Sequence, residues 1–210
     1  MPTKKVDNHA RHGWRVKVEI RRRVLEALTP AKTIVFDAFA GQGLMWLEVW
    51  KDAAGYVGCD ERWHNDERCC YVADNRRVLR GIELSHFTCF DLDAFDSPWE
   101  QAIIIAARRP RLARGERIGL VLSDGTSTRS GNWPPALRQA TGIKRSAADV
   151  GAVQLHDELI ARAVLRLVRQ MGGRIMRQWT AVAKPRFRYL GLIIEGAPSA
   201  PSAPCSDSNS

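Results

Sequence analysis

The sequence has few cysteines and no long apolar run. Its five cysteines are an odd number, and no two of them have the C-x-x-C spacing of a zinc site or redox motif. No apolar stretch approaches the ~20 residues that a helix needs to cross a bilayer. The first residues, MPTKKVD, also lack the apolar core of a signal peptide. These absences argue against a disulfide framework, a zinc site and a membrane protein, and they favour a cytoplasmic protein with reduced thiols.

The length and composition suit one globular domain. The chain has 210 residues, of which 45% are hydrophobic and 26% are charged, a mixture that can bury an ordinary core. We expect a basic, flexible arm over residues 1–13 and a single domain over residues 14–196. The ending APSAPSAPCSDSNS is of low complexity, so we expect a disordered tail over residues 197–210.

The charge is strongly basic. Lysine and arginine total 32 against 23 acidic residues, which gives a formal net charge of +9. Such a balance favours a polyanionic partner, and nucleic acid is the commonest one. Arginine far outnumbers lysine, however, and a GC-rich genome would produce the same bias. Charge alone therefore does not decide the substrate.

Short apolar runs alternate with helical patterns along the chain. Strands are expected at residues 33–37, 56–60, 87–90, 118–124, 174–182 and 188–195. Helices are expected at residues 14–28, 44–51 and 64–80, after Pro98, and at residues 153–171. Strands that alternate with helices predict a Rossmann-like α/β fold, with a mostly parallel sheet and helices on both faces. The short turn before residue 188 adds an antiparallel pair of strands at the C-terminal edge.

Four of the expected strands end in an acidic residue. These residues are Asp37, Asp60, Asp91 and Asp124. In an open α/β sheet, ligands bind beyond the carboxyl ends of the strands. Four carboxylates in this position are more than the general polarity of loops predicts, so the sequence indicates a ligand site along one rim of the sheet.

The turn after the first strand distinguishes between two classes of cofactor. Gly41 and Gly43 allow a ligand to approach the backbone closely, and a carboxylate at Asp60 suits the two hydroxyls of a ribose. A dinucleotide-binding turn would have a third glycine where Trp46 stands. Asp37 would also repel a pyrophosphate but attract the ammonium group of S-adenosylmethionine. The turn therefore favours S-adenosylmethionine as the cofactor.

These residues resemble a known family. Residues 37–43, DAFAGQG, resemble the D-x-F-x-G-x-G first motif of class I S-adenosylmethionine-dependent methyltransferases, and residues 56–60 resemble their second motif. The resemblance spans about residues 33–195. It implies that S-adenosylmethionine is the cofactor and that it is bound by Asp37, Phe39, Gly41, Gly43 and Asp60.

A third stretch is more distinctive. Residues 90–98, FDLDAFDSP, resemble the D-x-D-P-F-G-S-P segment of tRNA guanine-N2 dimethyltransferases, with Ala94 in place of proline and Asp96 in place of glycine. The chain lacks the C-terminal domain of that family. The resemblance implies that Asp91 and Asp93 face the transferred methyl group and that Asp93 orients or deprotonates an exocyclic amine. It also implies that Phe95 stacks on the base, although a core aromatic is an equally good interpretation.

A second alignment assigns the catalytic strand differently. Asp91 would then end the third strand and approach the adenine, while residues 123–125, SDG, resemble the S-D-x-x-P region of RNA ribose 2′-O-methyltransferases. Those enzymes pair the aspartate with two lysines and a glutamate, for which Lys17, Lys184 and Glu195 are possible counterparts. Asp124 is therefore a third catalytic candidate. The first alignment requires a missing or collapsed third strand, and the second requires a missing last helix.

The resulting hypothesis is a methyltransferase that acts on nucleic acid. RNA is favoured over DNA because the D/N/S-P-P-Y/F motif of DNA amino-methyltransferases is absent. Basic residues of the polar segment 127–150 are candidates for phosphate contacts, namely Arg129, Arg138, Lys144 and Arg145. Two other classes remain open: a catalytically degenerate methyltransferase fold that binds nucleic acid, and an NAD-dependent oxidoreductase. We expect no metal and no membrane partner.

Overall fold

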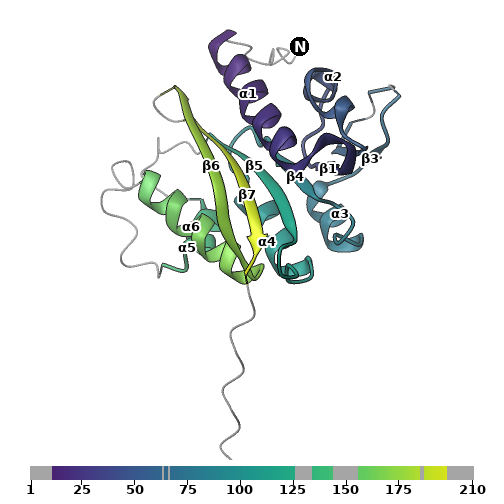
Figure 1. The fold of residues 1–210 in the computed structure, drawn as a ribbon. Helices are drawn as coiled ribbons and strands as arrows, with labels where there is room; N and C mark the ends of the chain where they lie inside the picture. Colours follow the sequence, from purple (N-terminus) through teal and green to yellow (C-terminus); the bar gives the residue numbers. More distant parts are fainter. Residues whose placement is uncertain are drawn as a thin grey trace, which may run out of the picture.

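The fold is built on one seven-stranded sheet (Figure 1). The computed structural model describes residues 11–62, 64–65, 67–125, 134–143, 156–184 and 187–197. The strand order is β3-β2-β1-β4-β5-β7-β6. The strands are β1 (Ile34–Asp37), β2 (Gly55–Asp60), β3 (Cys70–Val72), β4 (Cys89–Leu92), β5 (Arg117–Asp124), β6 (Gly173–Lys184) and β7 (Phe187–Gly196). The first five are parallel, while β7 is antiparallel to both β5 and β6. The predicted mostly parallel sheet with an antiparallel C-terminal pair is confirmed.

Helices cover both faces of this sheet. The helices α1 (Arg11–Leu28) and α2 (Leu44–Glu48) pack on one face. The opposite face carries α3 (Asn75–Gly81), α4 (Trp99–Arg108), α5 (Pro135–Thr141) and α6 (His156–Gln170). Two short 3-10 helices, η1 (Pro30–Lys32) and η2 (Trp50–Asp52), flank β1 and α2. None of the helices in the described part of the chain has the length and apolar character to cross a membrane.

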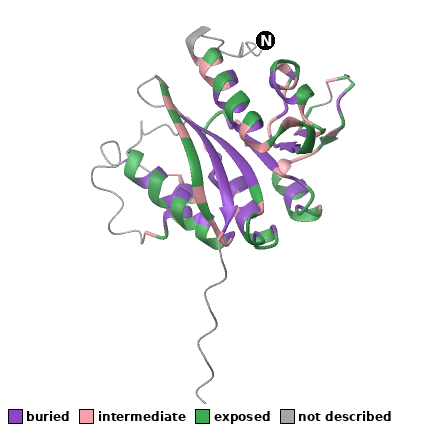
Figure 2. Ribbon diagram, in the orientation of Figure 1, coloured by how far each residue is buried: buried purple, intermediate pink, exposed green. Residues whose placement is uncertain are grey.

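Alternation along the central strands explains the two layers. Successive side chains of a strand point to opposite faces of the sheet. On β1, Val35 packs under α1 and α2, while Phe36 packs against the opposite helical layer. Val121 and Leu122 of β5 divide in the same way. Figure 2 shows the consequence, since the central strands are almost entirely buried.

The structure corrects the expected helix over residues 64–80. Only Asn75–Gly81 is helical, and it is preceded by the three-residue strand β3 (Cys70–Val72). The Asp74 side chain caps this helix by accepting a hydrogen bond from the Arg76 amide. The third strand is therefore present but very short, and β4, which ends at Leu92, lies directly beside β1. This position places Asp91 and Asp93 at the fourth strand and agrees with the first of the two sequence alignments.

The remaining expectations differ from the structure in detail. The polar segment 127–150 contains an unpredicted helix, α5 (Pro135–Thr141). Pro98 lies at the N-cap of α4, and the helix expected after it begins at Trp99. α1 begins at Arg11, inside the expected arm over residues 1–13, whose first ten residues lie outside the described chain. Of the expected tail, only residue 197 is described.

Candidate functional site

The topology brings the predicted acidic residues to one rim of the sheet. Asp37 pairs in parallel register with Gly58 on one side and with Asp91 on the other. The carboxyl ends of β1, β2 and β4 are therefore neighbours, and the turn 38–43 connects β1 to α2 along this rim. The rim is where ligands bind in open α/β sheets.

The glycine turn is shaped by left-handed backbone at two positions. Gly41 has φ of 45° and Gly43 has φ of 81°, values that glycine adopts without a steric cost. The Gly41 amide donates to the Asp60 carboxylate at 3.0 Å, so the end of β2 holds the turn in place. A Cβ on Gly41 would meet only the Phe39 carbonyl oxygen, at 3.8 Å. One side of the turn is thus open at Gly41.

Arg68 supports the other side of the turn. Its guanidinium is buried and donates to the carbonyl oxygens of Ala40 at 2.8 Å and Gly41 at 2.7 Å. A Cβ on Gly43 would lie 2.8 Å from the Arg68 Nε atom. The sequence analysis missed Arg68, because a contact across 27 residues leaves no local pattern.

Asp37 is a buried carboxylate at the base of the same turn. It accepts hydrogen bonds from the Phe39 amide at 3.1 Å and from the Tyr56 hydroxyl at 3.0 Å. Burial, with the nearby Asp91 carboxylate adding to it, raises the pKa of Asp37 to about 7. The Phe39 side chain is partly buried and packs on the core. Both residues therefore shape the turn from beneath.

Asp91 lies below the rim with no exposed surface. Arg21 of α1 binds it with two hydrogen bonds, at 2.6 Å from Nε and 2.8 Å from a terminal nitrogen. The Trp50 indole donates to the same carboxylate at 2.7 Å. This burial differs from the sequence expectation of a side chain that faces the methyl group. In the structure, Asp91 fastens α1 and η2 to the sheet.

Asp93 reaches the surface of the rim, with 14% of its side chain exposed. Lys17 of α1 lies 2.9 Å from it, and Arg21 lies 3.2 Å from it. Burial would raise the pKa of Asp93, but the Arg21 and Lys17 cations outweigh it and lower the pKa below its ordinary value. Asp93 is therefore ionised at neutral pH and acts as a hydrogen-bond acceptor.

Three aromatic residues belong to the segments next to this carboxylate. Phe95, two residues further on, is 77% exposed, so it is not the core aromatic that the sequence left as an alternative. The Tyr189 ring lies 5.7 Å from the Lys17 ammonium and stacks with Phe187 at 6.5 Å between centroids. A Cβ on Gly125 would collide with the Phe187 ring and lie 2.8 Å from the Phe95 carbonyl oxygen. A planar acceptor would therefore find aromatic surface next to Asp93.

Asp124 belongs to the opposite face of the sheet. Its carboxylate is fully buried, accepts from the Trp99 indole at 2.9 Å and lies 3.5 Å from His156. Glu195 is at the far end of the sheet, paired in register with Arg117. The group of Asp124, Lys17 and Glu195 considered for ribose methylation is thus not assembled, because Lys17 binds Asp93 instead. The Lys184 side chain lies outside the described residues.

Two further rim residues follow β3. The Asn75 side chain donates to the Ala38 carbonyl oxygen at 2.7 Å and accepts from Gln101 at 2.9 Å. Asp74 is partly exposed, and its hydrogen bonds with Arg76 lower its pKa to about 2. The sequence signal for these two residues was weak, because the strand before the Asp74 helix cap has only three residues, Cys-Tyr-Val.

Other expected groups are only partly described. Arg138 lies in α5, whereas Arg129, Lys144 and Arg145 fall outside the described residues. No cluster of three histidine, cysteine, aspartate or glutamate side chains that could hold a metal ion occurs in the described ranges.

Among the comparisons with known proteins, only the one with solved structures gives matches. No family model and no curated protein sequence matches the chain. A structure of Trm1 from Pyrococcus horikoshii with S-adenosyl-L-methionine aligns with a TM-score of 0.55 and 18% identity, over 87% of this chain and 56% of that one. The chain therefore shares the fold of the Trm1 structure. It spans little more than half the length of the Trm1 chain.

Two further structures extend this likeness. The magnesium protoporphyrin IX methyltransferase ChlM from Synechocystis, with S-adenosylmethionine bound, gives a TM-score of 0.52 at 10% identity, over 89% of this chain and 81% of that one. An rRNA methylase from Streptococcus thermophilus gives 0.50 at 9% identity, over 87% and 97% of the two chains. The antiparallel β7 between β5 and β6 also separates this fold from the parallel 3-2-1-4-5-6 sheet that binds dinucleotides.

Proposed function

We propose that the chain is an S-adenosylmethionine-dependent methyltransferase that acts on nucleic acid, with RNA favoured over DNA. One observation carries the proposal. Asp93, an ionised carboxylate, directly follows β4, the strand that pairs with β1, and the exposed Phe95 ring comes two residues later. A carboxylate acceptor next to an exposed aromatic ring suits a planar base that carries an amine.

The rim fits the cofactor. The open side of the turn at Gly41 leaves room for the amino-acid end, and each Asp60 oxygen retains a lone pair that a ribose hydroxyl can use. Asp74 and Asn75, at the next strand end, would lie toward the adenine. The Asp37, Phe39 and Gly43 positions would shape the turn that holds the cofactor. When bound, S-adenosylmethionine supplies the electrophilic methyl group.

The acceptor side depends on Asp93. Because its pKa is lowered, Asp93 is a weak base, and we assign it the orienting role rather than deprotonation. It would accept an N–H of the amine and direct the nitrogen lone pair toward the methyl group. Lys17 and Arg21 hold the carboxylate in position, while Phe95 offers its ring to the base. Such positioning supplies much of the rate in a transfer that needs in-line geometry.

The nucleic-acid substrate rests on charge and on the resemblance of residues 90–98. The net charge of +9 favours a polyanion. The neighbours in structure include both an rRNA methylase and a porphyrin methyltransferase, so they favour neither substrate class. A cytoplasmic location stays a prediction.

Calorimetric titration with S-adenosylhomocysteine tests the cofactor assignment. We expect micromolar binding by the wild type and at least tenfold weaker binding by Asp60→Asn, a loss of about 1.4 kcal/mol. Glu61→Gln, an exposed neighbouring change of the same kind, is the matched control and should bind as the wild type does. No binding to the folded wild type would contradict the proposal.

A second candidate is a degenerate methyltransferase fold that binds nucleic acid without catalysis. The replacements at Ala94 and Asp96 in the third motif support it. Transfer of a radiolabelled methyl group to total RNA distinguishes the two. Transfer that depends on Asp93 supports the enzyme, whereas RNA binding without any transfer supports the degenerate fold.

A further inference from the structure

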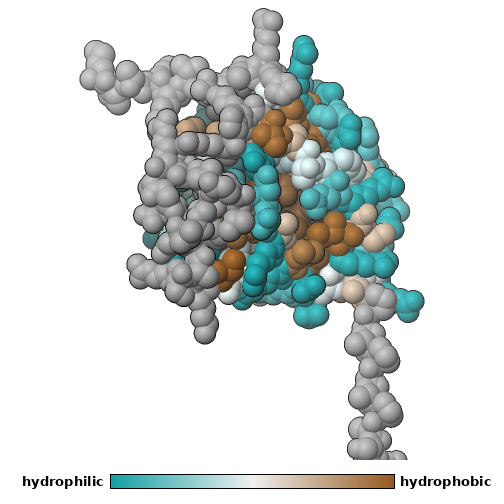
Figure 3. Space-filling model, turned by 90° about the vertical axis from the view of Figure 1, so that its left-hand side faces the viewer, coloured by the Kyte–Doolittle hydropathy of each residue, from teal (hydrophilic) through white to brown (hydrophobic). Residues whose placement is uncertain are grey.

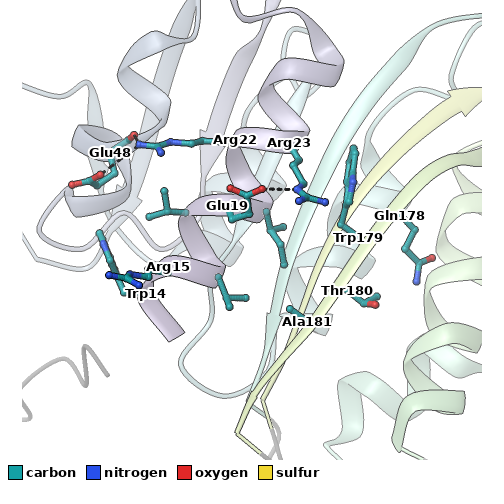
Figure 4. Close-up of a pocket in the computed structure, with 13 residues that line it drawn as sticks. Trp14, Arg15, Glu19, Arg22, Arg23, Glu48, Gln178, Trp179, Thr180 and Ala181 are labelled. Carbon is teal, nitrogen blue, oxygen red and sulfur yellow. Dashed lines mark hydrogen bonds and ion pairs between the residues drawn. The ribbon is translucent and has the colours of Figure 1, made fainter. Parts of the chain in front are cut away.

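A groove of about 940 Å³ lies between α1 and β6, outside the site described above. Two kinds of side chain stand out in its lining. Trp14 and Trp179 supply aromatic surface, and Arg15, Arg22 and Arg23 supply positive charge. Figure 4 shows Trp14 and Arg15 at the N-terminal end of α1, and Trp179 beside Arg23 between α1 and the sheet. The nine residue steps from Trp14 to Arg23 span about 14 Å of helix.

The groove and the candidate acceptor site use different sides of α1. Helix residues 14–16, 18–20, 22 and 23 line the groove. Lys17 and Arg21, which contact Asp93, are not part of that lining. The groove is therefore a surface of its own, separate from the Asp93 site.

The charges of the groove are available to a ligand. Arg15 is exposed and forms no ion pair within the described residues. Arg22 lies 3.8 Å from Glu48, and Arg23 lies 2.7 Å from Glu19, in pairs that are about half exposed. Exposed pairs of this kind are weak and screened by salt, so a phosphate can compete for the arginines.

The edge strand β6 carries exposed apolar side chains. Met176 and Val182 are both exposed, and Val182 lies on the side of β6 that faces α6. Figure 3, which views the molecule from its left-hand side in Figure 1, shows apolar surface between hydrophilic side chains. Bases require this combination of apolar aromatic platforms and nearby cations.

We infer that the groove between α1 and β6 binds single-stranded nucleic acid. Bases stack on Trp14 and Trp179, while phosphates contact Arg15, Arg22 and Arg23. A single strand is required because paired bases cannot offer their faces to the tryptophans. The inference rests on the proposed function for the choice of nucleic acid as the ligand, but the binding itself requires neither cofactor nor catalysis.

Fluorescence anisotropy of a labelled 12-nucleotide oligouridylate RNA, measured without cofactor, tests the inference. Trp179→Ala should raise the Kd about tenfold, and Trp179→Phe, which keeps an aromatic platform, should restore most of the affinity. Arg15→Gln should weaken binding and reduce the slope of log Kd against log salt by about 0.7, the value for one phosphate contact on a single strand. Arg169→Gln, an exposed change in α6, is the charge-matched control and should keep the wild-type Kd and slope.

The remaining outcomes separate this inference from the proposed function. RNA binding by the wild type without any methyl transfer would support the groove as a binding site and would contradict only the proposed enzyme activity. Equal Kd values for wild type, Arg15→Gln and Trp179→Ala would show that the groove does not bind the RNA, even if methyl transfer were observed. Tighter binding of a 12-base-pair duplex, or no RNA binding with capture of a protein partner through the same residues, would also overturn the inference. Arg15 is exposed, so its variant stays informative even if Trp179→Ala unfolds.

Discussion

The negative charge of Asp93 can be removed by a single substitution that keeps the shape of the side chain. Asp93→Asn removes the charge but keeps the shape, so we expect S-adenosylhomocysteine to bind unchanged while kcat for methyl transfer falls roughly 100-fold, as when one preorganised polar group is lost. Because the pKa of Asp93 is lowered, no loss of activity from its protonation is expected between pH 8 and pH 5. Radiolabelled methyl transfer across this range measures both effects.

Asp96→Asn is the control for this experiment. Asp96 is exposed in the same loop, and its backbone oxygen accepts a hydrogen bond from the Gly125 amide. Its variant should keep the wild-type kcat. Equal losses in both variants would show that the loop, and not the Asp93 carboxylate, supports the reaction.

Asp37 makes stability depend on pH in an unusual direction. Its folded-state pKa of about 7 lies above the ordinary 3.8, so between these values the folded protein binds the proton more tightly than the unfolded chain. The stabilising contribution is therefore present at low pH and is lost as the pH rises through about 7. Asp37→Asn removes this component, and its urea midpoint relative to the wild type should be higher at pH 8 than at pH 5. A difference between the two proteins that is constant with pH would contradict the assignment.

The candidate site was predictable where its residues are close in sequence. The turn from Asp37 to Gly43 and the acid at Asp60 follow from a local pattern, and the structure brings them together. Lys17 and Arg21 are about 70 residues away from the carboxylates that they bind, so no spacing in the sequence reveals them. The sequence also does not reveal the burial of each carboxylate. Asp91 and Asp93 are only two positions apart, yet Asp91 lies beneath the rim and Asp93 reaches its surface.

At the scale of elements, the sequence predicts a strand well when both of its faces are buried. β1, β4 and β5 read as apolar runs that end in an acid, and all three were predicted. β3 was missed because it has three residues, two of which are exposed at the edge of the sheet. A pattern of burial is the signal that sequence reasoning detects, and an exposed edge strand carries little of it.

A buried ion pair adds to the apolar packing that attaches α1 to the sheet. Arg21→Met leaves Asp91 without its guanidinium partner in a buried site, and we expect a loss of about 3 kcal/mol in the free energy of unfolding. Arg21→Met combined with Asp91→Asn removes both charges and should cost less than the sum of the two single changes. Urea unfolding of the four proteins measures the coupling. Additive losses would show that the ion pair contributes no specific attachment.

The glycine turn is the second element with a sharp structural requirement. Gly43→Ala places a Cβ at φ of 81° and 2.8 Å from Arg68, so we expect a loss of stability of about 1–2 kcal/mol and at least tenfold weaker binding of S-adenosylhomocysteine. Gly81→Ala is the matched control, because a Cβ there meets nothing within 4 Å and its φ is not left-handed. It should change stability by less than about 0.5 kcal/mol. Similar losses in both variants would contradict the special role of Gly43.

Across the whole molecule, the sheet divides into a central part covered on both faces and two edges that are not. β4 and β5 have helices on both sides, whereas β3 is short and β6 is largely exposed. Stability in such a structure is distributed unevenly, since opening an edge strand exposes little apolar surface. The proposed cofactor site joins these regions, because it extends from β1 at the centre to β3 at one edge.

Amide hydrogen exchange should therefore show a gradient and a specific response to ligand. We expect the slowest exchange in β4 and β5 and the fastest among the strands in β3. S-adenosylhomocysteine should slow exchange in the turn 38–43 and in β3, because a ligand that bridges β1, β2 and β3 must be released before either segment opens. The groove side of β6 makes no contact with the proposed cofactor site, so its exchange should stay unchanged and serves as the internal control. Slower exchange in β6 alone would place the ligand in the groove and contradict the cofactor site at the rim.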